Sequence, residues 1–434
     1  MTMSLTQDNA PRVLVFSNNS FSKSNSNGRT LGNLFAGWPR ERLAQFTIMC
    51  IDPDFEVCDN YYQVKDADAV RALVKGEKAV TGRVTQPTSA TSGSQRFSRA
   101  GGKTALKMLL RNAVWNIGRW RGKRFRRWVD DFAPEVIVVQ SGDSAFMLSL
   151  AASEARKRHI PLVIYNTEGY LFFDHNFMRP HWTDCVAHPL FKWHYRRVFR
   201  RALAASAHSV YLNGKLRDDY EAFMQHPATV IYNSSDLAFE PKAEIGKPPR
   251  ISYLGNLGIK RPEALAGVGQ VLNSISPELH IDVYGNASAA DEALLREAVG
   301  VEYHGSVPYE QVIEIIRQSD ILFHIEKNDS VLVRELRYAF STKIADSICS
   351  GTNFVVYAPA NLACSQYVAE TGAAWLASTP EQLRATVNRL LNNPAERRHV
   401  TEKAREAAHN HNLKTNATRF QSILNHLTLK YKSE

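Results

Sequence analysis

Two stretches of the sequence place lysines at the expected start of a helix, where anions bind. In the first, 253–261, a strand runs into a glycine-containing loop that ends with Lys260 and Arg261. Glycines let a backbone approach a phosphate closely, and the free amides of a helix start point at it. Each charge-assisted hydrogen bond contributes roughly 1.5–3 kcal/mol. Because a glycine after a strand often only makes a turn, this stretch alone fits a turn and a phosphate site equally well.

The second stretch, 338–356, predicts another phosphate site. Ser341 or Thr342 would cap a helix that begins near Lys343, so that helix amides and an ammonium group would face one anion. Asp346 follows Thr342 by about one turn on the same face, where a carboxylate could accept hydrogen bonds from ribose hydroxyls. Together the two stretches predict cationic pockets that converge on one pyrophosphate.

The amino-terminal half holds further candidates, each with a plain alternative. The polar loop 17–32 follows the first predicted strand and enters a helix at Gly28, next to Arg29, and ligands bind at the carboxyl ends of parallel strands. Glu168 follows the predicted strand 162–165, where a carboxylate could orient a hydroxyl group or accept its proton. The loop could instead be flexible with a simple helix cap, and a lone loop glutamate is usually a solvated acid.

A cluster of acidic and imidazole side chains suggests a metal site at first sight. Its members are Asp174, His175, His181, Asp184 and His188. Their spacing matches no HExxH or other ligand template. The five cysteines show no CxxC spacing either, so they are expected to be scattered reduced thiols. We therefore expect no metal, and histidines that are structural or line a cleft.

The net charge of +10 implies an anionic partner. Much of this charge lies in 96–128, which carries many Lys and Arg residues and no acid, interleaved with Trp115, Trp120, Phe125 and Trp128. The preceding residues, 81–102, are polar and predict a mobile loop. Basic and aromatic residues at helical spacing are typical of a nucleic-acid patch, a solvated helix or a helix at a membrane surface.

The membrane interpretation of 96–128 is favoured over the other two. No helix-turn-helix, ribonucleoprotein or zinc-finger pattern accompanies the segment, so no nucleic acid is expected. A solvated helix would need acids to balance its charge. An interfacial helix would insert Trp and Leu at the headgroup boundary, while each cation contributes about 1 kcal/mol near anionic lipid. We expect peripheral attachment to an anionic membrane surface.

The elements that must position these residues alternate along both halves of the chain. Short apolar runs read as buried strands at 12–16, 46–51, 136–139, 162–165, 209–212, 229–232, 251–254, 280–284, 301–303, 321–325 and 354–357. Such alternation with helices indicates doubly wound parallel sheets, hence an α/β fold with two Rossmann-like domains. The proline-rich segment 233–250 reads as the linker.

The expected domains are 1–240 and 241–412, with a terminal helix, 413–434, packing back on the first. No run of about 18 apolar residues occurs, and the first twenty residues lack a signal-peptide pattern. We expect the protein to stay in the cytosol.

The carboxyl-terminal motifs resemble the nucleotide-sugar half of GT-B glycosyltransferases, particularly family 4, over 250 to about 379. The resemblance rests on 253–261, 304–310, 319–324 and 338–356 in this order. It implies two domains that face a cleft and a nucleoside diphosphate sugar donor, with neither a metal nor a cofactor. The family's loop after the first strand supplies an arginine and a lysine to the diphosphate. Lys260 fits the lysine, Arg261 can share its role, and Asn256 stands at the usual arginine position.

The same resemblance implies further donor contacts. Gly305 and Val307 match the family's stretch at the nucleobase, and Gly285 joins the donor-binding set. The family's acidic pair is half present, since Asp346 matches the second acid and Tyr338 stands at the first.

A substitute for the missing first acid is therefore expected nearby. Glu335, Arg334 and Arg337 are the candidates, or the choice of donor is unusual. On the amino-terminal side, Gly28 and Arg29 are implied to lie near the donor diphosphate or the acceptor. Glu168 stands where many members carry a histidine beside the reacting sugar.

The implied function is an EC 2.4 glycosyltransferase that moves a hexose-type sugar to a glycan or lipid-linked acceptor. The resemblance also implies retention of configuration and a bacterial cell-surface polysaccharide or glycoconjugate as product. The expected place of action is the inner face of the cytoplasmic membrane. Lys260 and Lys343 would stabilise the leaving diphosphate, and Glu168 would act at the acceptor. The rivals are a nucleotide-sugar epimerase or hydrolase, and a catalytically silent partner subunit, which Asn256 and the incomplete acidic pair motivate.

Overall fold

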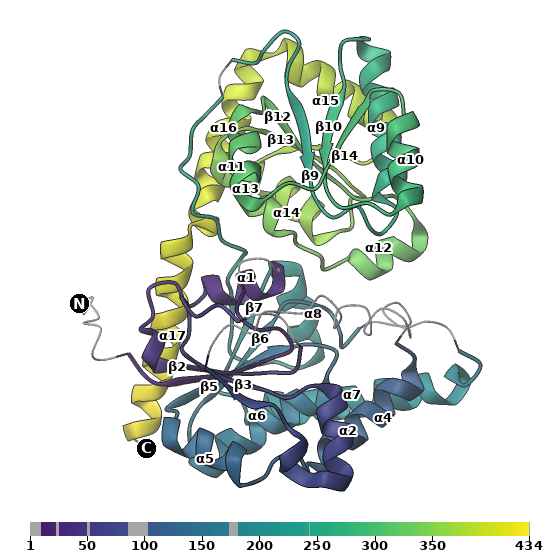
Figure 1. Ribbon diagram of the computed structural model, residues 1–434. Helices are drawn as coiled ribbons and strands as arrows, with labels where there is room; N and C mark the ends of the chain where they lie inside the picture. The colour runs from purple at the N-terminus through teal and green to yellow at the C-terminus, as the bar shows by residue number, and fades with distance from the viewer. Residues whose placement is uncertain are drawn as a thin grey trace. The chain divides into compact units, whose positions relative to one another are not determined.

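The chain folds into two compact units (Figure 1). The computed structural model describes residues 10–22, 26–49, 53–85, 103–172, 181–242 and 244–433. The first unit comprises Met1–Ile231 and Asn416–Glu434, and the second comprises Tyr232–Thr415. Most of the expected loop 81–102, together with Cys50, Asp174 and His175, lies outside the described residues.

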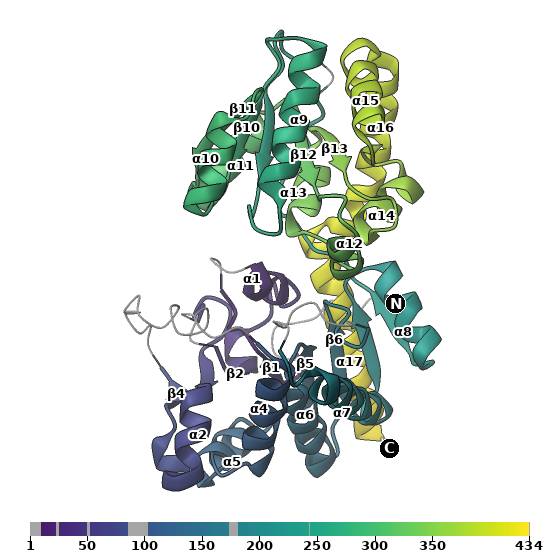
Figure 2. The same cartoon turned by 90° about the vertical axis from the view of Figure 1, so that its right-hand side faces the viewer.

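The first unit is built on an eight-stranded sheet in the order β4-β3-β2-β1-β5-β6-β7-β8, parallel except where β4 pairs with β3. Its strands are β1 Val13–Ser17, β2 Leu43–Thr47, β3 Asn60–Gln63, β4 Gly82–Val84, β5 Val136–Ser141, β6 Leu162–Asn166, β7 His208–Tyr211 and β8 Ala228–Val230. Its helices are α1 Ser26–Asn33, α2 Asp66–Lys75, α4 Ala105–Ile117, α5 Lys123–Phe132, α6 Ala145–Arg158, α7 Asp184–Ala205 and α8 Gly214–Phe223. The helices α4, α6 and α7 lie side by side (Figure 2).

The second unit holds a six-stranded parallel sheet in the order β11-β10-β9-β12-β13-β14. Its strands are β9 Ile251–Leu254, β10 Ile281–Tyr284, β11 Val301–Gly305, β12 Ile321–Ile325, β13 Asn353–Tyr357 and β14 Trp375–Ala377. Its helices are α9 Arg261–Ile275, α10 Ala289–Glu297, α11 Tyr309–Gln318, α12 Ser330–Leu336, α13 Thr342–Ser350, α14 Ala363–Thr371, α15 Pro380–Asn392 and α16 Pro394–Ala408. Parallel strands end at one edge, so their carboxyl ends bring distant loops together.

The expected α/β class with two parallel-sheet domains is confirmed. Each predicted strand coincides with or overlaps a strand of the sheets, because strands covered on both faces read as continuous apolar runs. The predicted strand at 46–51 instead begins at Leu43 and ends at Thr47. Three short strands, β3, β4 and β14, were not predicted.

The last helix, α17 (Leu413–Ser433), adds its apolar face to the first unit. Phe420, Leu424 and Leu427 belong to the same buried cluster as strand residues such as Val13. The side chain of Gln421 also donates to the carbonyl oxygen of Ala36 at 3.0 Å. The carboxyl-terminal helix therefore belongs to the hydrophobic core of the first unit, together with the first strand.

The aromatic residues of the basic segment are core residues, contrary to the expectation that they enter a membrane surface. Trp115, Trp120, Phe125 and Trp128 are at most 6% exposed. The ring of Phe46 on β2 stacks on Trp120 with 5.3 Å between centroids. The aromatics of α5 recur at the spacing of one helix face, so they pack under the sheet while the cations between them point outward.

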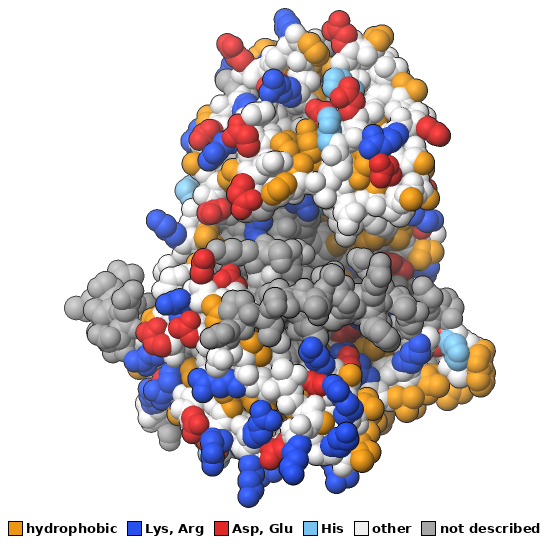
Figure 3. Space-filling view, viewed as in Figure 1, with side chains coloured by type: hydrophobic (Ala, Val, Ile, Leu, Met, Phe, Trp, Pro, Cys, Tyr) orange, Lys and Arg blue, Asp and Glu red, His pale blue; other side chains and the backbone are white. Residues whose placement is uncertain are grey.

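Acids from elsewhere in the chain balance part of this charge. Arg111 on α4 donates to the Asp66 carboxylate of α2 at 2.8 Å and lies 3.7 Å from the Asp143 carboxylate. Lys and Arg side chains still gather over α5 (Figure 3). A helix without acids of its own is therefore compatible with an ordinary solvated surface.

Candidate active site

The loop after β9 is held in a conformation that its residues do not adopt freely. Ile259 and Lys260 have φ values of 63° and 55°, in the left-handed region that disfavours side chains. Asn256 stabilises the turn, since its side chain accepts from the amide of Gly258 at 2.7 Å and its carbonyl accepts from the Tyr253 hydroxyl at 3.0 Å. Strained backbone of this kind is concentrated at functional sites.

The two cations of this loop have different partners. Lys260 reaches the Asp329 carboxylate at 3.0 Å and stays half exposed. Arg261 donates to the Glu326 carboxylate at 3.1 and 2.6 Å, and both of these side chains are largely buried. Lys260 is therefore the cation that an incoming anion can reach, whereas Arg261 anchors the loop to the end of β12.

Lys343 lies near the same cluster. His324 at the end of β12 is 3.5 Å from the Glu326 carboxylate. Burial lowers the pKa of His324 to about 4. The negative charge of Glu326 raises this pKa, whereas the positive charges of Arg261 and Lys343 lower it. The loop after β9 and the start of α13 thus both act on one neutral imidazole, which places them around the same edge of the sheet.

The start of α13 is capped as predicted. Ser341 is the N-cap residue, and its hydroxyl accepts from the amide of Lys343 at 3.3 Å, while the helix begins at Thr342. Asp346 lies on this helix but is only 3% exposed. Its carboxylate is therefore withdrawn from solvent in the structure, unlike the partly exposed residues at the helix start.

Three glycines join the ends of β9, β10 and β11. The amide of Gly255 donates to the carbonyl of Tyr284 at 2.9 Å, and the amide of Gly285 donates to the carbonyl of Gly305 at 2.8 Å. A Cβ on Gly285 would lie 2.1 Å from the carbonyl oxygen of Gly255, so no side chain fits. Gly255, Gly285 and Gly305 thus come together at this edge, and Asn256 and Val307 lie close to them in the sequence.

Tyr338, at the position of the missing acid, is only 1% exposed and is a core residue. Glu335 one turn earlier is partly exposed, and burial, followed by the charge of Asp329, raises its pKa. Asp329 itself caps α12, and its bonds to Lys260 and two helix amides lower its pKa to about 2. Glu335 therefore lies near the carboxylate that pairs with Lys260.

In the first unit, Gly28 permits a close approach between α1 and the preceding loop. A Cβ there would lie 2.5 Å from the carbonyl oxygen of Ser20 and 2.9 Å from the amide of Ser22. Arg29 follows on the same helix and is partly exposed. The glycine is thus required by packing, whatever the loop binds.

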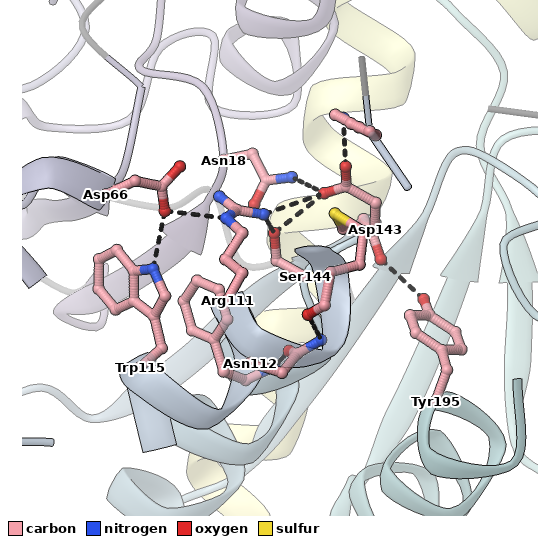
Figure 4. A network of polar contacts seen from close by, with 12 residues as sticks. Asn18, Asp66, Arg111, Asn112, Trp115, Asp143, Ser144 and Tyr195 are labelled. Atoms are coloured by element: carbon pink, nitrogen blue, oxygen red, sulfur yellow. Dashed lines mark hydrogen bonds and ion pairs between the residues drawn. The ribbon is translucent and has the colours of Figure 1, made fainter. Parts of the chain in front are cut away.

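A buried carboxylate that the sequence analysis missed lies at the end of β5. Asp143 is 3% exposed and pairs with Lys103 and Arg111 (Figure 4). It also accepts from Asn18 at 3.1 Å and from Ser144 at 2.9 Å. Although burial raises the pKa of Asp143, the charges of Lys103 and Arg111 outweigh it and keep the pKa below its ordinary value.

Glu168 lies at the end of the neighbouring strand β6. Burial raises the pKa of Glu168 to about 7. The charges of Glu168 and Asp143 add to burial in raising the pKa of Tyr170, so the three groups lie near one another. The signal for Asp143 was available, since it lies two residues beyond the carboxyl end of a central strand.

The acidic and imidazole side chains that suggested a metal site in the sequence form no ligand set among the described residues. His181 and Asp184 bond to one another at the start of α7, through the amide of His181 at 2.7 Å, and His188 is buried in that helix. A different group, His280, Asp282 and Glu302, brings three ligand atoms within 4.8 Å of one another.

Comparison with known families and structures identifies related proteins. A family model described as glycosyl transferase-like matches residues 268–425, which include the start of α13 and the glycines at the ends of β10 and β11. No curated protein matches the chain. The match confirms the expected enzyme class, a glycosyltransferase, for this part of the chain.

Solved structures extend the likeness over both units. The α,α-trehalose 6-phosphate synthase of Burkholderia multivorans has a TM-score of 0.56 at 11% identity, covering 98% of each chain. The sucrose-phosphate synthase of Thermosynechococcus elongatus has a TM-score of 0.57 at 12% identity, covering 96% of this chain and 100% of the other. HepE of Anabaena, in complex with UDP and glucose, has a TM-score of 0.53 at 11% identity, covering 95% and 99%. At such identities the likeness establishes the GT-B fold.

Proposed function

We propose that the protein transfers a hexose-type sugar from a nucleoside diphosphate sugar to a glycan or lipid-linked acceptor. The observation that carries this proposal is the gathering of Lys260, Lys343 and the capped start of α13 around the buried Arg261 and Glu326 pair. Retention of configuration and a role in cell-surface polysaccharide or glycoconjugate synthesis are part of the proposal. The UDP and glucose bound to the HepE structure support a donor of this chemistry.

The donor diphosphate would displace Asp329 from Lys260. In the structure this lysine is half exposed and held by one carboxylate, so a phosphate can replace that carboxylate without exposing a buried charge. Lys343 and the amides after Ser341 would bind the same diphosphate from the start of α13. As the bond to the sugar breaks, these groups stabilise the growing negative charge. The chemistry proposed here needs neither a metal nor an organic cofactor.

Donor recognition beyond the phosphates would use the edge formed by the three glycines. Gly285, Gly305 and Val307 would contact the nucleobase, and Asn256 would hold the loop after β9 near it. Asp346 would bind the ribose hydroxyls once its helix start is occupied. Glu335, which lies near Asp329, would replace the missing acid at the sugar.

The acceptor would bind at the carboxyl edge of the first unit's sheet. Glu168, whose pKa lies near 7, is suited to orient the acceptor hydroxyl or to accept its proton. Gly28 and Arg29 would lie near the same ligands. The trehalose-phosphate synthase of Burkholderia xenovorans, solved with glucose 6-phosphate, has a TM-score of 0.57 at 10% identity and supports an acceptor that carries sugar hydroxyls.

Calorimetric titration of the full chain with UDP, GDP and the other nucleoside diphosphates tests the donor site. One nucleotide should bind with a Kd in the micromolar range, and Lys260→Ala should weaken it at least tenfold. The absence of binding to every nucleotide would favour a catalytically silent partner subunit. Consumption of a nucleotide sugar without any acceptor would favour an epimerase or hydrolase.

The proposed place of action is an anionic membrane surface, with α4 and α7 of the first unit as the docking face. None of the helices in the described residues has the length and apolar character needed to cross a bilayer. Large apolar side chains are nevertheless exposed on these two neighbouring helices and just before α7, at Leu106, Leu110, Ile117, Trp182, Val186, Leu190 and Trp193. Hydrophobic side chains are exposed together where α7 begins (Figure 3).

The charge of these helices suits the same partner. Helix α4 contains no acid, and α7 contains none after Asp184 while it carries five cations. Exposed tryptophans beside cations are typical of helices that lie in a headgroup layer. The guanidinium of Arg197 lies 5.5 Å from the ring of Trp193, so the two groups would enter that layer together.

Sedimentation with vesicles of phosphatidylglycerol and of phosphatidylcholine tests this attachment. The protein should sediment with the anionic vesicles, and Trp182→Ala combined with Trp193→Ala should reduce the bound fraction several-fold. Leu429→Ala, which removes an exposed apolar side chain of α17, serves as the control. Equal recovery in the supernatant with and without vesicles would exclude the membrane partner.

A further inference from the structure

Strands β10 and β11 form the edge of the second unit's sheet and have helices on one face. Helix α9 contacts both strands, and α10 contacts β11. They cover the face that carries Ile281, Val283 and Val301, which are at most 9% exposed. Because side chains alternate along a strand, the residues between these point to the opposite face. Their side chains are 42% exposed at His280, 20% at Asp282, 58% at Glu302 and 37% at His304.

On this open face two carboxylates are direct neighbours across the two strands. Asp282 on β10 is the register partner of Glu302 on β11. Like charges opposite each other across two strands destabilise the pairing. Each carboxylate has an imidazole beside it: His304 Nε2 lies 2.6 Å from Asp282 Oδ1, and His280 Nε2 lies 3.7 Å from Glu302 Oε1. Histidine and acidic side chains lie together on this surface of the second unit (Figure 3).

We propose that His280, Asp282 and Glu302 bind one transition-metal dication such as Zn²⁺. One nitrogen and two carboxylate oxygens from these residues lie within 4.8 Å of one another. Tetrahedral ligands at Zn²⁺ distances of about 2.0–2.2 Å are roughly 3.3 Å apart. The 3.7 Å between His280 and Glu302 is close to this separation, so small rotations of exposed side chains complete the site. Water takes the fourth position.

His304 is a positioning residue at this site. Its distance of 2.6 Å from Asp282 Oδ1 is that of a hydrogen bond and is too short for two ligands of one ion. The imidazole therefore donates to one oxygen of Asp282 and leaves the other for the metal. The ring of Tyr284 stacks on His304 at 4.7 Å between centroids and fixes its plane. Partners of this kind orient metal ligands and raise their affinity.

The donor set selects the class of ion. An imidazole combined with carboxylates suits Zn²⁺ and its neighbours, whereas Ca²⁺ and Mg²⁺ prefer oxygen ligands alone. The bound ion neutralises the opposed carboxylates and links β10 to the edge strand β11, which continues into Gly305 and Val307. None of its ligands belongs to the proposed donor site, so the site is independent of the proposed transfer reaction.

Calorimetry of the full, untagged chain with ZnCl₂, after treatment with a chelator, tests the site. One ion should bind per chain, and Co²⁺ should give the visible absorption of a low-symmetry four-coordinate ion. His280→Ala and Glu302→Gln should each weaken Zn²⁺ binding at least tenfold. His399→Ala removes an exposed histidine of α16 in the same unit and should leave the affinity unchanged.

A second comparison separates the role of His304 from that of the ligands. His304→Ala should weaken binding severalfold, and His304→Gln should restore most of the affinity because its amide can still donate to Asp282. The proposal is overturned if the unaltered chain binds no stoichiometric Zn²⁺, or if His399→Ala weakens binding as much as His280→Ala does.

Discussion

The Arg261 guanidinium donates to both oxygens of the Glu326 carboxylate, from Nε at 3.1 Å and from Nη2 at 2.6 Å. The two side chains are 13% and 3% exposed. This pair joins the loop after β9 to the end of β12, and its arginine also donates to the carbonyl of Asn256 at 3.2 Å. The loop that carries Lys260 is therefore positioned by a buried ion pair from a neighbouring strand.

Removing Glu326 should destabilise the second unit strongly. Glu326→Ala leaves the Arg261 charge buried without its partner, which costs about 3–5 kcal/mol of the free energy of unfolding. Urea denaturation measures the loss. The double variant Arg261→Met and Glu326→Leu should lose less than Glu326→Ala alone, because it leaves no unpaired charge. Lys260→Ala, whose pair is half exposed, is the control and should change stability little.

Lys343→Ala should reduce turnover without unfolding the protein. Removing one group that stabilises developing charge typically costs about 10²- to 10³-fold in kcat. Ser341 caps α13 without help from the lysine side chain, so the helix should persist. Circular dichroism and a transfer assay with the nucleotide sugar identified by titration measure the two effects. Lys403→Ala on α16 is the matched control, and near-normal turnover of Lys343→Ala would remove this lysine from the site.

The fold was predictable where strands are covered on both faces. Runs such as Val136–Val139 and Ile321–Ile325 are apolar at nearly every position, since helices lie above and below them. The strand β3 reads Asn-Tyr-Tyr-Gln and β14 has only three residues, so neither gives a periodic signal. The aromatics of the basic segment 96–128 were misread because a sequence does not show that Trp120 contacts Phe46 in the core.

Parts of the candidate site were predictable where a feature depends only on residues that are neighbours in the sequence. The cap at Ser341 and the loop ending in Lys260 depend on neighbouring residues alone. The pairs that fix the site join residues far apart, such as Lys260 with Asp329, and one sequence gives no sign of them. Asp143 could have been named from its place after β5, but its pairing with Lys103 and Arg111 could not, because these residues lie in another part of the chain.

The stability of the first unit should depend on pH because of Glu168. Burial raises its pKa from 4.5 to about 7, so the folded state holds this proton more tightly than the unfolded chain. The resulting stability is present below pH 4.5 and is lost as the pH rises through about 7. At most about 3.5 kcal/mol is involved, since each pKa unit corresponds to about 1.4 kcal/mol.

Glu168→Gln should remove this dependence and alter the rate. Urea denaturation at several pH values should show that the difference in stability between the variant and the unaltered chain grows between pH 5 and pH 8. If Glu168 accepts the acceptor's proton, kcat should rise with pH around 7 in the unaltered chain and be low and flat in the variant. The control is Glu154→Gln, a glutamate paired with Lys157 and Arg158 on α6. Identical stability profiles for Glu168→Gln and the unaltered chain would show that the carboxyl is not buried.

Gly285→Ala should disrupt the edge where β9, β10 and β11 end. The new Cβ would lie 2.1 Å from the Gly255 carbonyl oxygen, which is backbone and cannot rotate away. The strand ends must then separate and lose the hydrogen bond from Gly285 to Gly305. Both stability and nucleotide affinity should fall, by more than about 1 kcal/mol and at least tenfold, because overpacking typically costs 1–3 kcal/mol.

The matched control is another glycine of the same unit. Gly267 lies inside α9 with nothing within 4 Å of the position of a Cβ, so Gly267→Ala should stabilise the helix by up to about 1 kcal/mol. Calorimetric titration with the bound nucleotide measures affinity, and urea denaturation measures stability. If Gly285→Ala keeps the affinity while Gly267→Ala behaves as expected, the three strand ends do not form the nucleobase site. The donor would then have to be held by the start of α13 and Lys260 alone.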